Sequence, residues 1–495
     1  MGRLFFWRSV EKASKNKEMN PTSPQKLPEI VTIDAIQKEL EGISDVVCKE
    51  IQTPEDTVTI IYFTSLVDSL DFHETVIVPL MKDDLQKTAE VIDNDNLSGM
   101  LALITEGDTV LYFHKKNVFL KMNTFSPPTS PIANSDTEST VSGPRDSFTE
   151  SLQTNLSLIK RRIQNTGLKN RDYRIGTETN TKVSVMYIEK IVNENNLTKV
   201  INKIEAIDHR GFDDISTLAQ LMEDHQFSPF PQYQITERPD LVASSLIDGR
   251  VIIMMNNSIG AMICPSSFLG FFMSPEDYYN RWTTATLLRS IRFFGFFLTI
   301  MLTPFYISAL SYHPEMLPYE VLKSIHESRS RVPFPPVIEV LFMELVIEVL
   351  REAGSRMPTK IGQTIGIVGG IVIGTAAVEA GLVSNILIVL VAISALLSFL
   401  PPSFKMSNAS RFVRYIFILS AGFFGLYGQM IAFAWLIYHL VNLTSLGTPF
   451  MSPVIPRKWT DLLDSIVLVP PAFQKHKKGI VGTERKKVLP EEGEE

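Results

Sequence analysis

The pattern of polar and apolar positions divides the chain into two unlike parts. Charged residues recur throughout positions 1–285, whereas positions 290–442 are mostly apolar. In the first part, apolar residues at helical spacing predict a helix at 29–48, and a β-branched run predicts a strand at 57–63. The same criteria predict helices that begin after Ser147 and end near Gln164, at 196–206 and at 213–224, and strands at 183–188 and 249–255. They predict strands or short helix–strand alternations at 75–80, 101–104 and 110–113.

Two serines are candidates for helix caps. Ser147 with Glu150 three residues later has the spacing of a capping box for the helix that ends near Gln164. Ser274, followed by acidic residues, is expected to cap a second helix just before the apolar part begins.

Four uncharged runs in the second part predict membrane-spanning helices, since a bilayer core needs about twenty helical residues. These runs lie at 293–312, 361–378, 384–400 and 415–438, with a polar loop expected at 313–333. Tyr278, Tyr279 and Trp282 precede the first run, and amphipathic aromatic residues of this kind gather at membrane–water interfaces. We therefore expect an α+β fold class, in which a soluble amino-terminal region of two small α/β subdomains precedes a multi-span transmembrane helical bundle.

The stretch at 333–384 is the most unusual part of the sequence. Its first half is apolar but carries Glu339, Glu344 and Glu348. Its second half carries a glycine at every fourth position, namely Gly362, Gly366, Gly370 and Gly374. On a helix this spacing places the glycines on one face, where another backbone can approach closely. We therefore expect these glycines to serve in helix packing.

The three glutamates admit three interpretations. Carboxylates at membrane depth usually face a cavity or a partner, so one stripe per subunit of an oligomer would form negative rings in a cation pore. Alternatively, the carboxylates form structural ion pairs, for example Glu348 with Arg351. In a third interpretation the segment lies on the membrane surface as an amphipathic helix. The first interpretation is favoured, which makes Glu339, Glu344 and Glu348 candidate pore or vestibule residues.

Lys and Arg near membrane spans favour the cytoplasmic side. Basic clusters at 281–292, 351–360 and 401–414 place these segments, and the soluble amino-terminal region, in the cytoplasm. The tail after Arg457 is also basic, yet a single crossing at 415–438 would place it outside. Either that last apolar run is a re-entrant hairpin, or the charge rule fails for the tail.

Composition narrows the classes of function. The net charge is −7 and no basic patch interleaves with aromatic residues, which argues against nucleic-acid binding. Cys48 and Cys264 are far apart, so buried free thiols are expected rather than a disulfide or metal ligands. No dinucleotide, phosphate-loop, zinc or nucleophile-elbow motif occurs, and we predict no catalytic residue, metal site, cofactor or enzymatic activity. Asp240 and Asp248 are interpreted as solvated loop residues rather than catalytic carboxylates.

A stretch rich in Pro, Ser, Thr and Asn at 123–142 predicts a linker. Together these observations predict a flexible tail at 1–28, an α/β subdomain at 29–122, the linker, a second α/β subdomain at 143–285, a transmembrane helical domain at 286–442, and a polar basic tail at 443–495.

Six long motifs characterise the chain. They are GPRDSFTESLQTNLSLIKRRI at 143–163, ERPD at 237–240, SPEDYYNRW at 274–282, SYHPEMLP at 311–318, RVPFPPVIEVLFMELVIEVLREAG at 331–354, and IGQTIGIVGGIVIGTAAVEAGLVS at 361–384. With these motifs the chain resembles, over nearly its whole length, the A subunits of the nutrient germinant receptors of endospore-forming bacteria. The first 120 residues match this family more loosely.

The resemblance implies a multi-pass protein of the spore inner membrane that works with a transporter-like B subunit and a lipoprotein C subunit. It implies that the nutrient is bound mainly by the B subunit. It further implies that the A subunit oligomerises into a nutrient-gated cation channel that triggers germination, without enzymatic activity. The alternative is a non-conducting scaffold or signal transducer. A secondary transporter is less favoured, because the sequence shows no internal repeat.

Overall fold

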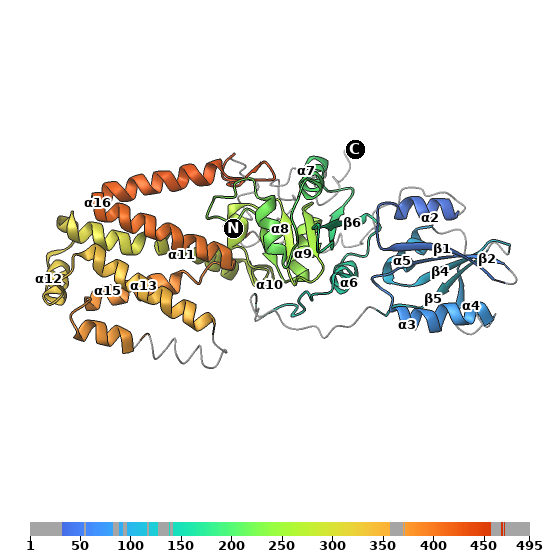
Figure 1. The fold of residues 1–495 in the computed structure, drawn as a ribbon, viewed down its shortest axis with the longest axis horizontal. Helices are drawn as coiled ribbons and strands as arrows, with labels where there is room; N and C mark the ends of the chain where they lie inside the picture. The colour runs from blue at the N-terminus through green and yellow to red at the C-terminus, as the bar shows by residue number, and fades with distance from the viewer. Residues whose placement is uncertain are drawn as a thin grey trace, which may run out of the picture. The chain divides into compact units, whose positions relative to one another are not determined.

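The computed structural model divides the chain into two compact units, the first built mainly from Asp45–Pro127 and the second mainly from Gly167–Glu495 (Figure 1). It describes residues 32–456 together with 467, 468 and 470, apart from 54–55, 83–88, 93–96, 116–117, 127–137, 139–141, 357–369 and 371. The predicted flexible tail at 1–28 and most of the predicted basic tail therefore lie outside the described residues.

The first unit is a five-stranded antiparallel sheet with helices. The sheet has the order β1-β2-β4-β5-β3, with strands β1 Val46–Gln52, β2 Thr57–Phe63, β3 Ala89–Ile92, β4 Thr109–Phe113 and β5 Val118–Met122. The helical elements are α2 Ile33–Leu40, α3 Ser69–Phe72, a π-helical turn His73–Ile77, α4 Val78–Lys82 and α5 Leu97–Glu106. Val58, Ile60 and Leu111 of the sheet pack against Leu80 of α4 to form the core.

The predicted strand at 57–63 is confirmed, and 110–113 falls within β4. The runs at 75–80 and 101–104 are helical, and the strands β3 and β4 follow them, so the helix–strand alternation is confirmed. The alternative that these two runs are strands is wrong, because a short apolar run does not by itself distinguish a strand from a helix. The helix predicted at 29–48 ends at Leu40, and its last part is wrong, because the edge strand β1 begins at Val46. Cys48 lies on this edge strand and is exposed, whereas Cys264 is buried as predicted, and both are free.

The soluble part of the second unit is a sheet covered on both faces by helices (Figure 1). The sheet is antiparallel with the order β6-β7-β9-β10-β8, formed by β6 Leu168–Ile175, β7 Thr181–Ile188, β8 Gln234–Thr236, β9 Val251–Met255 and β10 Ala261–Cys264. Its helices are α6 Leu152–Arg162, α7 Glu194–Glu205, α8 Ile215–Met222, α9 Pro239–Ile247 and α10 Glu276–Tyr279. Val200 and Leu218 pack on one face, and Leu156 and Leu246 pack on the other.

The helices predicted at 196–206 and 213–224 and the strands at 183–188 and 249–255 are confirmed to within two residues at each end. The helix that ends near 164 is confirmed but begins only at Leu152, and the two predicted caps are wrong. The N-cap of α6 is Ser151, whose side chain accepts a hydrogen bond from the Thr154 N–H. The preceding Phe148 donates its backbone N–H to Glu237, which keeps Ser147 outside the helix. At α10 the N-cap is Pro275 rather than Ser274.

The rest of the second unit is helical. Its helices are α11 Trp282–Ser311, α12 Tyr319–Arg329, α13 Pro336–Ser355, α15 Asn385–Leu397 and α16 Phe404–Asn442, and residues 372–379 are also helical. The polar loop predicted at 313–333 is wrong, because it contains a short 3-10 helix and α12. Among the described residues, α11 and α16 are long and apolar enough to cross a membrane, and α15 is a shorter apolar helix. The further crossings of the predicted bundle stay predictions.

Helix α16 is broken into two legs at Gly425, whose φ of +57° and ψ of −136° are not helical (Figure 1). The turn is tight, since a Cβ on Gly428 would collide with the Ser420 carbonyl oxygen. Met406 near the start of the first leg and Leu440 near the end of the second belong to one apolar cluster. The run predicted at 415–438 is therefore not one straight span, and the hairpin alternative agrees with the structure.

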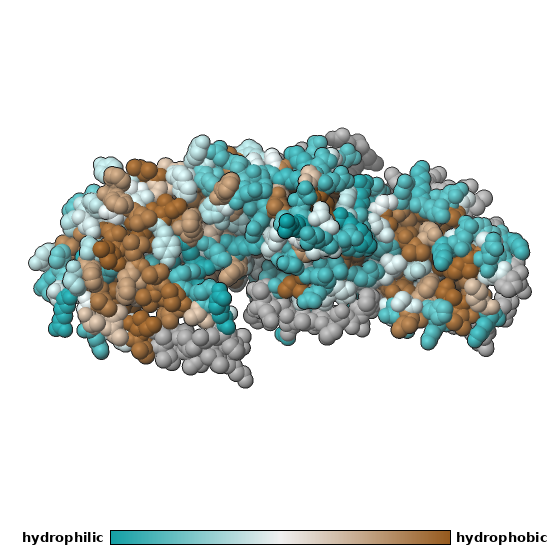
Figure 2. All heavy atoms as spheres, in the orientation of Figure 1, coloured by the Kyte–Doolittle hydropathy of each residue, from teal (hydrophilic) through white to brown (hydrophobic). Residues whose placement is uncertain are grey.

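The legs of α16 carry a large apolar surface. At about 1.5 Å per residue, the legs at 404–424 and 426–442 measure about 31 and 25 Å, close to the thickness of a bilayer core. Phe423, Phe424 and Tyr427 near the bend are among its most exposed side chains. Figure 2 shows apolar atoms gathered over the helices of this part of the chain, whereas the surface over α8 and α9 is mostly polar. Soluble proteins rarely expose apolar patches of more than a few hundred Å².

Candidate functional site

The glutamates of α13 meet arginines from other helices. Glu339 is fully buried, and its Oε2 lies 3.2 Å from the Nε of Arg329 in α12. Its Oε1 accepts a hydrogen bond of 2.6 Å from the backbone N–H of Ser384, just before α15. This carboxylate therefore joins α13 to α12 and to the start of α15.

Glu344 forms a second pair deeper in the helical part. Its Oε2 lies 2.8 Å from Nη2 of Arg414 in the first leg of α16, and both side chains are at most 1% exposed. Thr303 of α11 donates to the other carboxylate oxygen at 3.2 Å, and Arg414 donates to Ser394 of α15 at 2.7 Å. One ion pair thus connects four helices.

Glu348 pairs with Arg411, also in the first leg of α16. The alternative of structural ion pairs named Arg351 as the partner of Glu348, but Arg351 instead donates to the Ser398 hydroxyl at 2.8 Å and lies 4.4 Å from the ring centroid of Phe399. We call the three pairs Glu339–Arg329, Glu344–Arg414 and Glu348–Arg411 the ion-pair ladder.

The ladder neutralises the carboxylates that the sequence marked as pore candidates. Around Glu344 and Glu348 lie three guanidinium groups, those of Arg351, Arg411 and Arg414, so this part of the site carries one surplus positive charge. A cation would meet bare carboxylates here only after the pairs separate. The assignment of the three glutamates to a pore stays a prediction.

The glycine segment is described only in part. Gly362 and Gly366 lie outside the described residues. At Gly370 and Gly374 an added Cβ would meet no described atom within 4 Å. The described part of this chain therefore leaves the glycine face open, and the predicted packing partner stays a prediction.

A further ion-pair cluster lies where the soluble part joins α11. Asp277 is fully buried and accepts from Nε of Arg289 at 2.9 Å and from Nη1 of Arg292 at 2.8 Å. The Ser274 N–H donates to the same carboxylate at 3.1 Å. Sequence reasoning missed this cluster, although the acidic first turn of SPEDYYNRW followed by arginines is a usable signal. It holds α10 to the third turn of α11.

The ERPD motif forms a buried pair beside this junction. The Arg238 guanidinium lies 2.7 Å from the Asp240 carboxylate, which also accepts from the Tyr279 hydroxyl at 2.6 Å. Burial opposes ionisation of Asp240, but these hydrogen bonds hold its pKa below the ordinary value. Burial and the same carboxylate raise the pKa of Tyr279 to about 12. The interpretation of Asp240 as a solvated loop residue is therefore wrong, whereas Asp248 is the C-cap of α9.

The chain returns to the soluble part after α16. We call Thr444–Pro449, which holds the short strands β11 Thr444–Ser445 and β12 Thr448–Pro449, the return turn. Asp224 accepts hydrogen bonds of 2.8 Å from the Thr444 hydroxyl and the Gly447 N–H. The Ser445 hydroxyl donates to the Gln232 carbonyl at 2.8 Å. The soluble part is therefore bonded to the start of α11 and to the segment after α16.

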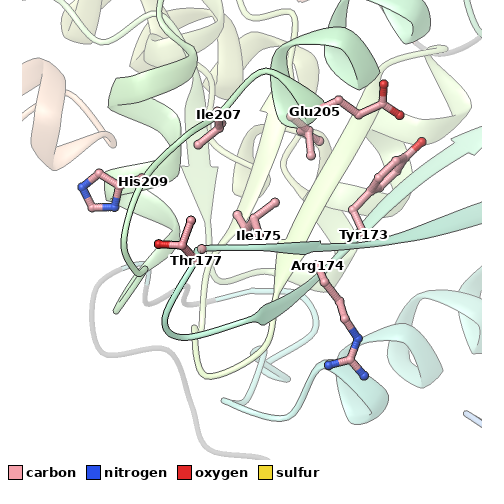
Figure 3. Close-up of a pocket in the computed structure, with 9 residues that line it drawn as sticks. Tyr173, Arg174, Ile175, Thr177, Glu205, Ile207 and His209 are labelled. Atoms are coloured by element: carbon pink, nitrogen blue, oxygen red, sulfur yellow. The ribbon is translucent and has the colours of Figure 1, made fainter.

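A pocket of about 380 Å³ opens beside the end of β6 (Figure 3). Tyr173 and Ile175 project from one side of the strand and Arg174 from the other, with Ile207 and His209 on the facing loop. Its volume is near the lower end of the range for small-molecule sites. Sequence reasoning missed this pocket, because its residues carry no distinctive spacing. Among the described residues no group of three His, Cys, Asp or Glu side chains gathers as a metal site.

The chain is similar in sequence to several known proteins. Over 459 residues the chain is 36% identical to spore germination protein GerQA of Bacillus cereus, covering 90% of this chain and 92% of that protein. It is 39% identical over 423 residues to spore germination protein A1 of Bacillus subtilis (strain 168), covering 83% and 87%. The crystal structure of the N-terminal domain of the A subunit of the Bacillus megaterium spore germinant receptor GerK3 aligns with a TM-score of 0.37 and 22% identity, covering 50% of this chain and 99% of that one. The model of the Bacillus/Clostridium GerA spore germination protein family matches residues 34–480, and the chain belongs to this family.

Proposed function

We propose that this chain is the membrane-embedded A subunit of a nutrient-sensing germinant receptor in the spore inner membrane. Family membership supports the receptor role. The observation that carries the membrane assignment is the exposed apolar surface on both legs of α16, whose lengths of about 31 and 25 Å are close to the thickness of a bilayer core. Its partners would be a transporter-like B subunit, which is the main nutrient-binding subunit, and a lipoprotein C subunit.

Within this receptor, the helical part opens a path for monovalent cations when several copies assemble. Helix α13 supports this step, because it carries Glu339, Glu344 and Glu348 among apolar residues, and the first two are buried. Separation of the ion-pair ladder would turn these carboxylates toward the path. The open glycine face at Gly370 and Gly374 offers a surface on which a second copy can pack closely.

The soluble part lies on the cytoplasmic side and couples to the helices in this proposal. The Asp277 cluster ties it to α11, and the return turn ties it to α16. The hairpin form of α16 supports a cytoplasmic tail, because both of its ends lie toward the soluble part. A change in the soluble part could therefore reach both helices.

A non-conducting scaffold or signal transducer is the second candidate. It is favoured by the ion-pair ladder itself, because Glu339, Glu344 and Glu348 all have arginine partners within a single chain. In that case the ladder would serve only to hold α13 in place, and cation release would occur through another subunit.

Cation efflux distinguishes the two candidates. Vesicles that hold the chain with its B and C partners are loaded with potassium and exposed to a panel of nutrients. We expect nutrient-triggered efflux that Glu344→Gln with Glu348→Gln abolishes or makes unselective. Because loss of Glu344 also leaves the buried Arg414 unpaired, efflux is compared between preparations that hold the same amount of assembled complex. Glu352→Gln, which alters an exposed surface pair, is the matched control. Unchanged efflux in the double variant would reject the glutamates as part of the path, and no efflux from an assembled, nutrient-binding complex would favour the transducer.

A further inference from the structure

The loop between α8 and β8 presents a fully exposed phenylalanine. Phe227 has 103% of its reference accessible area, whereas an apolar side chain gains stability when it leaves water. The loop is nevertheless well braced. The amide of the buried Gln232 accepts from the backbone N–H groups of Asp224 at 2.8 Å and His225 at 3.1 Å, and donates to the His225 carbonyl at 2.8 Å. Phe227 is therefore exposed to solvent on a loop whose backbone is fixed by hydrogen bonds.

This loop lies at the end of the second leg of α16. The Ser228 hydroxyl is 2.9 Å from Nε2 of His439, and the His439 ring stacks on Trp435 with centroids 5.5 Å apart. Phe230 is buried in the apolar cluster that also holds residues of α11 and α16. The loop that carries Phe227 thus lies beside one end of α16, a helix long enough to cross a bilayer.

The chemistry around Phe227 is suited to lipid. Trp435 and Tyr438, in the last turns of α16, are exposed aromatic residues of the kind found at membrane–water interfaces. The two carboxylates of the loop are engaged elsewhere, because Asp224 pairs with Lys203 at 2.5 Å and Glu223 accepts from the Gln232 N–H at 3.2 Å. Because both carboxylates already have partners within the protein, neither has to stay in contact with water when the tip of the loop meets lipid.

We propose that Phe227, Trp435 and Tyr438 form an aromatic anchor that inserts into the interfacial layer of the bilayer. The anchor docks the soluble α/β part on the lipid surface beside α16. It rests on the proposed function in one respect, since it requires α16 to lie in the membrane. Its occupant is lipid, and a protein partner is the competing outcome in the test below.

Spin labels on the full chain in lipid nanodiscs test the anchor. Phe227→Cys is labelled in a Cys48→Ser background, in which the remaining Cys264 is buried. The measurement is the ratio of collision rates with oxygen, which enters lipid, and with a water-soluble nickel complex. Ile259→Cys is the control, because Ile259 is also exposed but lies at the end of β10 that points away from α16. The other end of β10 leads to the 3-10 helix Phe268–Phe272, which packs in the same apolar cluster as α16. Tyr438→Cys reports on α16 itself.

We expect a collision ratio at position 227 that is several-fold higher than at 259 and close to that at 438. A ratio at 227 as low as at 259, with 438 lipid-like, would overturn the anchor and leave the membrane assignment intact. Water-like values at all three positions would instead reject the membrane assignment of α16. A label at 227 that is shielded from both reagents only when partner subunits are present would replace lipid with a protein contact and overturn the proposal.

Discussion

Removal of the Arg414 guanidinium should strongly destabilise the helical part of the chain. Arg414 and Glu344 are both at most 1% exposed, and their charged atoms are 2.8 Å apart. Loss of one member of such a pair leaves the other charge buried without compensation, which costs about 3–5 kcal/mol. Arg414→Gln should therefore lower the folding equilibrium constant by roughly two to four orders of magnitude. Thr303 alone, with one hydrogen bond to the carboxylate, does not replace the guanidinium.

The assay is unfolding of the purified full chain in mild detergent, followed by tryptophan fluorescence. Trp282 at the start of α11 and Trp435 in α16 report on the helical part. The surface pair Glu352–Arg356 provides the control, because its side chains are 63% and 79% exposed. Arg356→Gln should change the free energy of unfolding by only about 0.3–0.5 kcal/mol, the usual value for an exposed pair one helical turn apart.

A double-mutant cycle tests the reasoning directly. Replacement of both Glu344 and Arg414 by glutamine removes both buried charges, so the double variant should be more stable than the sum of the single changes predicts. The coupling energy should lie at the upper end of the range of about 0.5–3 kcal/mol found for contacting residues. An Arg414→Gln variant as stable as Arg356→Gln, or strictly additive single changes, would refute a stabilising role for this pair.

Three further predictions concern other parts of the second unit. Burial raises the pKa of Glu138 from 4.5 to about 6, so the folded protein retains a proton that the unfolded chain releases. The associated stability, about 2 kcal/mol, should be present below pH 4.5 and lost as the pH rises through 6, and Glu138→Gln should remove this dependence in a pH series of denaturant melts. Gly428→Ala should prevent the tight turn of α16, because the new Cβ would collide with the Ser420 carbonyl, and cysteine-accessibility mapping of the second leg should detect the change. Asp277→Asn should destabilise the junction by about 3–5 kcal/mol by leaving the buried Arg289 without a counter-charge, and a lower yield of folded protein in detergent than for Glu276→Gln, a change in the same turn, is the check.

The sequence alone predicted the features that depend on neighbouring residues. The division into a charged and an apolar part, the strand at 57–63 and the glutamate-bearing helix α13 follow from local periodicity. The helices and strands assigned between 183 and 255 are present for the same reason. The misplaced cap at Ser147 came from a motif that the nearby Ser151 could also satisfy, and the long-range backbone hydrogen bond from Phe148 to Glu237 decided between them.

Only the tertiary structure identified the partners of the glutamates and the course of α16. Glu344 pairs with an arginine seventy positions later in the sequence, and no local pattern distinguishes Arg414 from Arg351 as its partner. The bend at Gly425 is hidden from hydropathy, because a window of apolar residues looks the same whether the helix continues or turns back. Glycine accepts a positive φ without a steric penalty, so packing against Tyr312 and Ser420, rather than the local sequence, determines where the chain reverses.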